Sequence, residues 1–520
     1  MSNSNTPPEP QQEPTTPQVS TKKRFAWGLG GFSDCMMYQG VNGLIDPIYN
    51  IGMGIDARII GLARSIPRFA DIFIDPAIGH VSDNTRSRWG RRSPWMLAGA
   101  LIAAIIAIAM WFLPDWREPL FSVREAIFWG DPIVFDGRSI FMVIMMVLLF
   151  TFGYSLFTIP YTGQGYELTT DYTERTHLFK WRQYAYAVAG FLTPWLLPLC
   201  VKLDILFYGI AADKANGTHG IQWVGMLVGI LILVTALGPI LFSGKGKTAH
   251  TGEEKVSFFH AIAFTMKNLA FWPLVLGNFM YKFCGAVTGC FFMYLMIYKV
   301  SQGNMDDGSI QLAVFFNLIN IASFFAMAPV VHLINKFDKK PALLGLMLAS
   351  AAVYATVYYT FQPISGWTAD VANWMSQNLH ISYSICKAWP VYLSGIGIGI
   401  FCNCMPLLIN SMLADVCDVD ELKSGHQRQA FYGAAFVTTD KIAMGVAMLM
   451  QGFLLEASGF QKGVFVGDPV ESMAYWMKAL MLTQPVGFLL GFVCILFYPI
   501  TRAKAAETRR LLDQRATKNP

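Results

Sequence analysis

Four charged residues follow one another closely within the apolar segment 58–82: Arg64, Arg68, Asp71 and Asp75. Helix positions three or four apart lie on one face, so the four side chains would form a continuous polar stripe. Two carboxylates this close in a low dielectric stay ionised together only when a positive charge joins them. Such a pair can share a proton, or its oxygens can bind a monovalent cation.

Arg64 and Arg68 allow a second arrangement, in which they neutralise both aspartates as a structural ladder of ion pairs. A third combines the two: Arg68 poises the carboxylates, and a cation completes the charge balance. Pro67 and Pro76 lie in the same segment. We expect them to loosen the helix and to free carbonyl oxygens as further ligands.

Asp34 lies in the apolar segment 25–50, with Tyr38 one turn later. A buried carboxylate beside an aromatic ring suits sugar hydroxyls, which need hydrogen-bond acceptors and a flat apolar surface. The alternative is an ion pair between Asp34 and a lysine of another segment, such as Lys441. The two are compatible, because a substrate can break such a pair.

Asp440 and Lys441 are adjacent in the segment 431–457 and point about 100° apart on a helix, so they do not pair with each other. We expect Lys441 to face a cavity and to compensate the charge of Asp71 and Asp75. Three further charges lie in apolar segments: Lys282, a second candidate for this compensation, and Arg58 and Lys478, which we expect to extend to the membrane surface.

The segments that position these residues are apolar. Of the 520 residues, 54% are hydrophobic and 14% are charged, against about 25% charged in a typical soluble domain. The mean hydropathy is +0.41. This composition excludes a soluble enzyme, a nucleic-acid-binding protein and a disordered scaffold. It indicates a multi-pass membrane protein.

We expect twelve membrane-spanning helices, because that many apolar stretches approach the 20 or so residues that cross a bilayer. Most Lys and Arg residues outside these stretches lie in every second connection and in both tails, which predicts cytoplasmic termini in the inner membrane. The connection 114–138 on the opposite side is either a lid or a long loop. The expected spans are 25–50, 58–82, 94–113, 139–164, 178–201, 221–243, 269–298, 309–335, 342–362, 388–414, 431–457 and 472–500.

The longest cytoplasmic connection divides the spans into two sets of six, and a weak repeat supports this division. Residues 79–92 and 332–340 carry clusters of basic and polar residues at matching places in the two sets. Two six-helix bundles related by an axis along the membrane normal form a transporter architecture with a substrate site between them. We therefore expect a disordered tail (1–21), a first bundle (22–243), a central loop (244–268), a second bundle (269–500) and a basic tail (501–520).

The residues provide little for catalysis or for a cofactor. The eight histidines are scattered, without a zinc-protease or nucleophile-elbow pattern. The nine cysteines lie mostly in apolar stretches, and we expect them to be free thiols. We expect no enzyme activity, no nucleic-acid partner and no cofactor other than a coupling ion.

The second apolar segment and the connection after it resemble the glycoside–pentoside–hexuronide:cation symporters of the major facilitator superfamily. The resemblance covers residues 22–500 and rests on three matches, with Phe32-Ser33-Asp34 and Ile159-Pro160-Tyr161 in support. The matches are Arg68-Phe-Ala-Asp71-Ile-Phe-Ile-Asp75-Pro76-Ala-Ile-Gly79 with Thr85-Arg86-Ser87-Arg88-Trp89-Gly90-Arg91-Arg92-Ser93-Pro94-Trp95, then Asp415-Val-Cys-Asp418-Val-Asp420-Glu421-Leu-Lys423-Ser424-Gly425, and Lys441.

This resemblance implies a role for each matching residue. The implied cation site, which would hold Na⁺ or H⁺, comprises Asp71, Asp75, Ser155 and Arg68. In the implied substrate site, Asp34 would accept sugar hydroxyls beside Tyr38, and Lys441 would link the two halves near the cation site. The site is completed by the residues at the family's other sugar-binding positions, Thr158, Thr162 and Gln183. The implied cytoplasmic gate, which would brace the two halves, comprises Asp83, Arg86, Arg88, Arg91, Arg92, Asp415, Asp418, Glu421 and Lys423.

Departures from the family pattern bear on the ion and the substrate. Ile74 stands where melibiose permease, the best-known member, has an amide, which favours H⁺ over Na⁺ without deciding between them. Thr158 and Thr162 replace its galactoside-binding Asp and Trp, and Gln183 replaces an Arg, with Arg182 adjacent. The resemblance thus implies a monomeric symporter of a sugar or glycoside other than a galactoside, working by alternating access in contact with membrane lipid. The alternative is an uncoupled facilitator or exchanger of a non-sugar solute or an amphipathic lipid.

Overall fold

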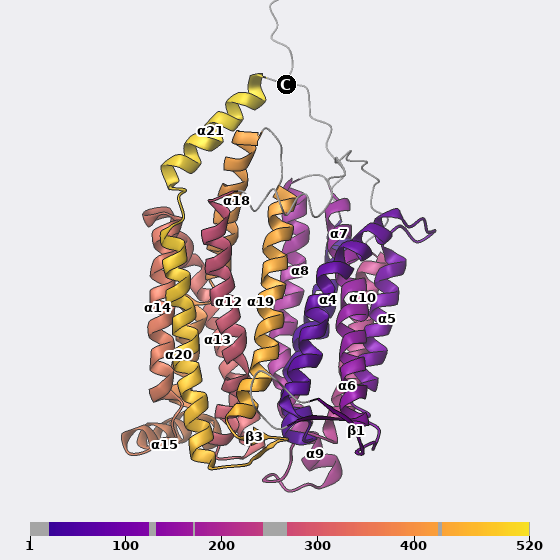
Figure 1. The fold of residues 1–520 in the computed structure, drawn as a ribbon, viewed down its shortest axis with the longest axis vertical. Helices are drawn as coiled ribbons and strands as arrows, with labels where there is room; N and C mark the ends of the chain where they lie inside the picture. Colours follow the sequence, from indigo (N-terminus) through magenta and orange to yellow (C-terminus); the bar gives the residue numbers. More distant parts are fainter. Residues whose placement is uncertain (1–19, 124–131, 170–171, 243–267, 425–428, 519–520) are drawn as a thin grey trace, which may run out of the picture.

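The computed structural model describes residues 20–123, 132–169, 172–242, 268–424 and 429–518. The tail expected over 1–21 and the central loop expected over 244–268 lie almost wholly outside the described residues. The described chain is nearly all helical (Figure 1).

The helices of the described residues form twelve rods, here called spans 1 to 12. These rods run between two ends of the molecule (Figure 1). The first half contains span 1 (α1 Thr21–Gly28, α2 Gly30–Cys35, η1 Met36–Gly40, α3 Val41–Ile45, η2 Asp46–Gly52), span 2 (α4 Ala57–Asn84), span 3 (α5 Ser93–Ala109), span 4 (α6 Gly137–Val147, η3 Leu148–Tyr154, α7 Ser155–Glu167), span 5 (α8 Tyr172–Leu192, η4 Thr193–Trp195, α9 Leu196–Tyr208) and span 6 (α10 Gly220–Leu237, η5 Gly238–Phe242).

The second half repeats this arrangement. It contains span 7 (α12 Phe271–Tyr294, η6 Leu295–Val300), span 8 (α13 Met305–Phe337), span 9 (α14 Lys339–Thr360), span 10 (α17 Trp389–Phe401, α18 Met405–Ser424), span 11 (α19 Gln429–Ala457) and span 12 (α20 Pro469–Leu496).

Short elements mark the two ends of the bundle. The hairpins β1–β2 (Pro119–Val123, Ile133–Asp136) and β3–β4 (Phe460–Gln461, Val464–Phe465) lie at one end with α15 (Trp367–Leu379) and α16 (Tyr383–Cys386). We call this the hairpin end. The surface helix α21 (Arg502–Lys518) lies at the opposite end, the tail end (Figure 1). The first hairpin comes from the connection expected to be a lid or a loop.

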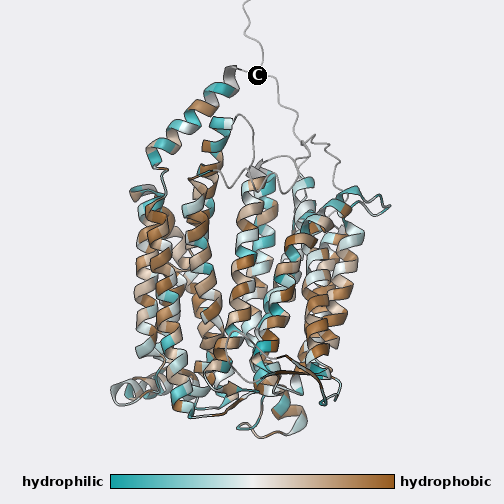
Figure 2. Cartoon of the chain, in the orientation of Figure 1, coloured by the Kyte–Doolittle hydropathy of each residue, from teal (hydrophilic) through white to brown (hydrophobic). Residues whose placement is uncertain are grey.

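Hydropathy explains this arrangement, because a membrane-spanning helix needs apolar residues over its length. Nine helices of the described residues are long and apolar enough to cross a membrane. Figure 2 shows mostly brown outer helices, such as α5 and α10, and paler or teal residues along α4 and α19 in the middle. The expected twelve-helix major facilitator fold is confirmed, and charged residues collect where the two halves meet.

Two local expectations were wrong. The α-helix of span 2 runs unbroken through Pro67 and Pro76, whereas π-helical turns, which often accompany functional sites, lie elsewhere, including η3 of span 4. The region from Asp415 onward, expected as a connection, continues α18 to Ser424. Its polar residues extend the helix past the apolar stretch, which hydropathy alone does not distinguish from a loop.

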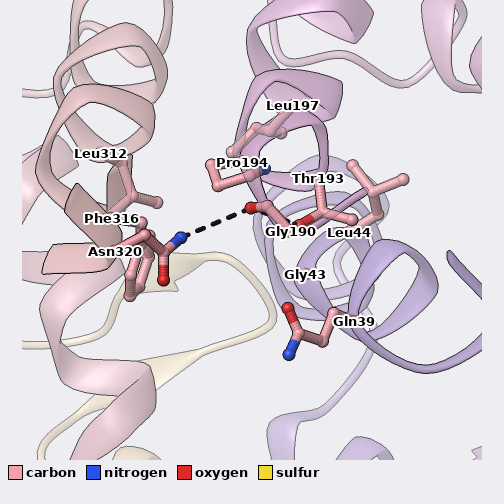
Figure 3. Close-up of a pocket in the computed structure, with 10 residues that line it drawn as sticks. All are labelled: Gln39, Gly43, Leu44, Gly190, Thr193, Pro194, Leu197, Leu312, Phe316 and Asn320. Carbon is pink, nitrogen blue, oxygen red and sulfur yellow. Dashed lines mark hydrogen bonds between the residues drawn. The ribbon is translucent and has the colours of Figure 1, made fainter. Parts of the chain in front are cut away.

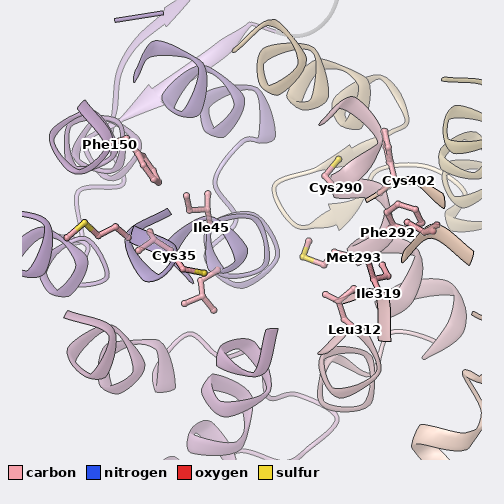
Figure 4. Packing of buried hydrophobic residues seen from close by; sticks show 14 of the residues in the cluster. Cys35, Ile45, Phe150, Cys290, Phe292, Met293, Leu312, Ile319 and Cys402 are labelled. Atoms are coloured by element: carbon pink, nitrogen blue, oxygen red, sulfur yellow. The ribbon is translucent and has the colours of Figure 1, made fainter. Parts of the chain in front are cut away.

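Apolar side chains of both halves form one buried cluster. Figure 4 shows Cys35, Ile45 and Phe150 among helices of the first half and Phe292 and Cys402 among those of the second. All nine cysteines are free, as expected.

The halves touch where α4 crosses α19. A Cβ on Gly61 would lie 2.7 Å from the Met448 carbonyl oxygen, and one on Gly452 would lie 2.4 Å from that of Ala57. The two glycines therefore allow close backbone contact near the hairpin end.

Candidate functional site

Asp71 and Asp75 lie on α4 where it faces span 4. Asp71 is buried and accepts hydrogen bonds from Arg68 Nη1 at 3.2 Å and from Ser155 Oγ at 3.4 Å. Asp75 is the more accessible of the two, with a side chain 26% exposed against 2% for Asp71. The two carboxylates and the Ser155 hydroxyl therefore meet at one point between two spans of the first half.

Lys441 reaches this point from the other half. Its Nζ forms an ion pair with Asp75 Oδ2 and lies 3.8 Å from Asp71 Oδ2. The two aspartates, Arg68 and Lys441 carry no net charge together, so the cluster is balanced without an added cation. This placement matches the expectation that Lys441 compensates the acidic pair.

Three oxygens beside this cluster offer further coordination. Among the described residues, Asp75 Oδ1 and the hydroxyls of Thr151 and Thr158 are buried without a hydrogen-bond partner. Thr151, Ser155 and Thr158 are four and three positions apart, so they share a face of span 4, the face from which Ser155 contacts Asp71. Buried polar atoms are normally satisfied, so these oxygens are candidate ligands for a cation or for a protonated carboxylate.

The described residues contain no group of three or more His, Cys, Asp or Glu side chains that could hold a metal ion. Two carboxylates with neutral hydroxyls form a weaker ligand set that suits a monovalent cation. Thr151 was missed by the sequence analysis. Its spacing from Ser155 is the signal that would have found it.

Arg68 is held by aromatic rings. Its guanidinium lies over the Tyr38 ring, 4.7 Å from the centroid, and near the Phe150 ring at 5.7 Å. Cation–π contacts fix the orientation of a buried guanidinium. Tyr38, implied to bind substrate, thus also supports the group that bonds Asp71.

Asp34, the other buried carboxylate, pairs with Arg182 Nη2 at 2.9 Å. The ion pair with another span is therefore present, with Arg182 as the partner, and Lys441 pairs with Asp75 instead. In the sequence, Arg182 stands out only as the neighbour of Gln183, and that adjacency was the available signal. One turn further along spans 1 and 5, Gln39 Nε2 donates to the Tyr186 hydroxyl at 2.9 Å.

Arg64 departs from the expected stripe. Its Nη1 bonds Asp46 Oδ2 of span 1 at 2.6 Å. Of the two arginines, Arg68 alone therefore pairs with Asp71, and the expected ladder of four charges is wrong. Arg58, expected at the membrane surface, is instead 4% exposed between Asp56 at 2.7 Å and Glu456 of the other half at 3.4 Å. A buried arginine needs such partners.

A cavity of about 240 Å³ separates spans 1 and 5 from span 8 (Figure 3). Gln39 and Gly190 line it on one side, and Phe316 and Asn320 on the other; Asn320 Nδ2 donates to the Gly190 carbonyl at 3.5 Å. Gln183 lies seven residues before Gly190, about two turns, and so shares its face of α8. It is exposed.

Thr158 and Thr162, implied to bind substrate, line a separate cavity of about 380 Å³ between α4 and α7. Asp83 and Arg92 of the implied gate line it too. The structure therefore brings Asp34 and Tyr38 close to the interface of the halves and the two threonines to a groove within the first half.

Ion pairs of the implied gate join residues of the same half. Arg92 bonds Asp83 at 2.6 Å and Glu167 at 3.0 Å, and Arg91 bonds Glu167 at 2.6 Å. In the second half, Lys339 pairs with Asp415 at 2.6 Å and Arg509 with Asp418 at 3.9 Å. Arg86, Arg88 and Lys423 are exposed, and Glu421 is half-buried. Bracing between the halves stays a prediction for another conformation; residues 425–428 lie outside the described residues.

Among the curated relatives found by comparison with known proteins, the three described here each span nearly the whole chain. A putative glycoside/cation symporter of Escherichia coli is 23% identical, covering 96% of both chains. An isoprimeverose transporter of Lactiplantibacillus pentosus is 22% identical, covering 96% of this chain and 93% of its own. A sodium-dependent lysophosphatidylcholine symporter of Gallus gallus is 21% identical, covering 97% and 91%.

Solved structures and a family model agree with the fold. A bacterial homologue of the human lysosomal transporter Spinster, solved in an inward-facing and unoccupied conformation, superposes with a TM-score of 0.59 at 14% identity over 95% of this chain and 98% of its own. The family model described as MFS/sugar transport protein matches residues 26–502. The chain therefore belongs to this transporter family, and within the major facilitator superfamily to the glycoside–pentoside–hexuronide:cation symporters.

Proposed function

We propose that the protein is a secondary active transporter that carries a sugar or glycoside across the cytoplasmic membrane together with H⁺ or Na⁺. The observation that carries this proposal is the ion pair of Lys441 with Asp75, which joins the second half to a buried carboxylate pair in the first. A charged group supplied by one half to the other links the site's charge state to the movement of the halves.

Charge balance gives a mechanism for coupling. In the empty carrier Lys441 and Arg68 neutralise Asp71 and Asp75, so the halves can change orientation at low cost. When a cation or proton binds the aspartates, it loosens the hold of Lys441, and substrate must bind to restore a stable contact between the halves. Cation and substrate then raise each other's affinity by the same factor.

Contacts between the halves support an inward-facing state. Tyr294 donates to Asn50 Oδ1 at 2.8 Å, Lys202 bonds Asp306 at 2.6 Å, and Arg58 bonds Glu456, all toward the hairpin end. The implied gate at the tail end instead pairs within each half. If the tail end is cytoplasmic, as the Lys and Arg distribution indicates, this conformation opens to the cytoplasm.

The test is Asp75→Asn in proteoliposomes. The matched control is Asp115→Asn, which makes the same change at an exposed aspartate near the hairpin end. We expect Asp75→Asn to reduce gradient-driven accumulation to the level of protein-free vesicles while exchange of substrate persists. A pH electrode and ²²Na⁺ identify the ion. Full accumulation by Asp75→Asn would contradict the coupling assignment.

A second candidate function is transport of an amphipathic lipid. The lysophosphatidylcholine symporter among the relatives and the apolar lining of the central cavity by Leu44, Leu312 and Phe316 favour it. A fluorescent lysophospholipid added to the same vesicles separates the two: uptake of this probe, with none of any sugar, would replace the sugar by the lipid.

A further inference from the structure

A second polar cluster lies in the second half of the protein, which contributes only Lys441 to the proposed cation site. Lys282 of α12 pairs with Asp440 of α19 at 3.3 Å, and Asn278 Nδ2 also donates to Asp440. Asn278 is 2% exposed, whereas the side chains of Lys282 and Asp440 are 31% and 20% exposed. This ion pair is therefore fixed on one side and open on the other.

The pair occupies the position that Asp34 and Arg182 occupy in the first half. Asp34 and Arg182 join the first and fifth spans of that half, and Lys282 and Asp440 join the first and fifth spans of the other. Each residue lies ten to thirteen positions from the tail-end start of its span, which is a depth of about 15–20 Å. Only the order of the charges is reversed between the halves.

Lys282 faces the space between the halves. Met293 follows it on α12 by eleven residues, which is about three turns and returns to the same face. Figure 4 shows Met293 pointing from the second half toward the first. A charge at this depth is too costly to expose to lipid, so its 31% exposure fits a water-filled space.

We propose that Lys282 and Asp440 form a second substrate subsite, opposite that of Asp34 and Arg182. In each subsite the carboxylate accepts from a sugar hydroxyl and the cation donates to its neighbour, so a vicinal diol fits either pair. Two such subsites at one depth, on opposite walls, select a substrate with a hydroxylated ring at each end. The ligand class is therefore a disaccharide or comparable glycoside, not a monosaccharide.

This inference rests on the proposed function and narrows its substrate. A purely architectural pair would also join α12 to α19, and ion pairs of this kind often contribute little net stability. The two roles differ in selectivity: an architectural pair influences every substrate alike, whereas a subsite for one ring influences only substrates long enough to reach it.

The experiment measures equilibrium binding of sugars to the full-length purified protein. The probes are lactose, isoprimeverose and cellobiose, with xylose and glucose as single rings. The variants are Lys282→Gln, Asp440→Asn and the charge exchange Lys282→Asp with Asp440→Lys. Lys478→Gln is the matched control, because Lys478 is an exposed lysine of α20, a helix that contributes neither Lys282 nor Asp440.

We expect wild-type protein to bind at least one disaccharide more tightly than the single rings. Lys282→Gln and Asp440→Asn should each lower the affinity for that disaccharide by about tenfold or more, because each variant loses a hydrogen bond to a charged group. Binding of the single rings should fall by no more than about twofold, because the subsite of Asp34 and Arg182 remains for them. Binding of the coupling ion should be unchanged. The charge exchange should restore part of the lost affinity, and Lys478→Gln should match wild type.

Two other results have separate meanings. The subsite is overturned if the wild type binds disaccharides and the variants bind them equally well. It is also overturned if the variants lose affinity for single rings to the same extent as for disaccharides. Either result leaves the proposed function intact. A wild type that binds none of the sugars while it transports a lipid overturns both. Poor folding of the single variants is recognised by lost ion binding, and the charge exchange, which retains a pair, then decides.

Discussion

Thr151 and Ser155 are hydroxyl residues beside a carboxylate pair, and each offers one oxygen to a small cation. We expect Thr151→Val, which keeps the shape and removes the hydroxyl, to lower the apparent cation affinity by about tenfold. Substrate affinity at saturating cation should be unchanged. Uptake at varied Na⁺ concentration or pH measures this, with Thr356→Val, an exposed threonine of α14, as control. Equal cation dependence in both variants would exclude Thr151 as a ligand.

Tyr38 has two possible contributions that substitution can separate. Its ring lies against the Arg68 guanidinium, 4.7 Å from ring centroid to Cζ. Its hydroxyl would bind substrate if the implied substrate site is correct. We expect Tyr38→Phe to retain cation affinity, because the ring remains, and Tyr38→Ala to lower it several-fold. A loss of substrate affinity in Tyr38→Phe would instead assign the hydroxyl to the substrate.

The sequence identified the site residues whose burial in a membrane costs the most free energy. Asp71, Asp75 and Lys441 stand out because a charge in an apolar segment demands a reason, and the structure brings them together. Partners were harder to predict. Arg182 and Asp46 lie on other spans than their partners Asp34 and Arg64. Which charges meet depends on how the helices pack, and the spacing of residues within one span does not show this.

At the scale of elements, the contact between α4 and α19 depends on two glycines. A Cβ at position 452 would lie 2.4 Å from the Ala57 carbonyl oxygen, so Gly452→Val must force the helices apart at the hairpin end. Cys290 lines the small cavity beside this contact, and its thiol is buried. In a variant that keeps only this cysteine, we expect Gly452→Val to increase labelling by a membrane-impermeant maleimide several-fold.

Gly345→Val is the control for this experiment, since a Cβ there meets nothing within 4 Å. Unchanged labelling of Cys290 would mean that the hairpin end stays closed without the glycine contact.

Element limits followed hydropathy closely where the chain is apolar. They failed at α18, whose acidic residues prolong the helix to Ser424, and at the hairpins, whose short strands carry little periodicity. Pro67 and Pro76 do not loosen span 2 as expected, because packing of α4 against α19 and span 4 preserves the α-helix around both prolines. Local propensity is overridden by such tertiary contacts.

At the scale of the whole molecule, Lys441 connects the charge state of one half to the position of the other. Without it, the empty carrier would hold two aspartates against Arg68 alone. We expect Lys441→Gln to slow the return of the empty carrier, so that net uptake falls by at least about tenfold while exchange of loaded substrate continues. Parallel assays of net uptake and of exchange measure the two rates in the same vesicles. Equal losses of both rates would contradict this role of Lys441.

The overall architecture was predictable because a bilayer admits few solutions. Twelve apolar stretches, a charge asymmetry between connections and a midpoint loop predict two six-helix bundles. The conformation was not predictable: which end is closed depends on contacts such as Lys202 with Asp306, whose residues lie in different halves and appear in the sequence as ordinary charges near helix ends.

The zero net charge of Asp71, Asp75, Arg68 and Lys441 has an electrical consequence. If these four groups move as one unit, the unloaded protein transfers no charge when it reorients, whereas the protein carrying a proton or Na⁺ transfers one. A transmembrane voltage, worth about 2.3 kcal/mol per charge at 100 mV, would then act on the loaded step alone. The resting potential of the cell would drive the outward-to-inward stroke and leave the return stroke to thermal motion.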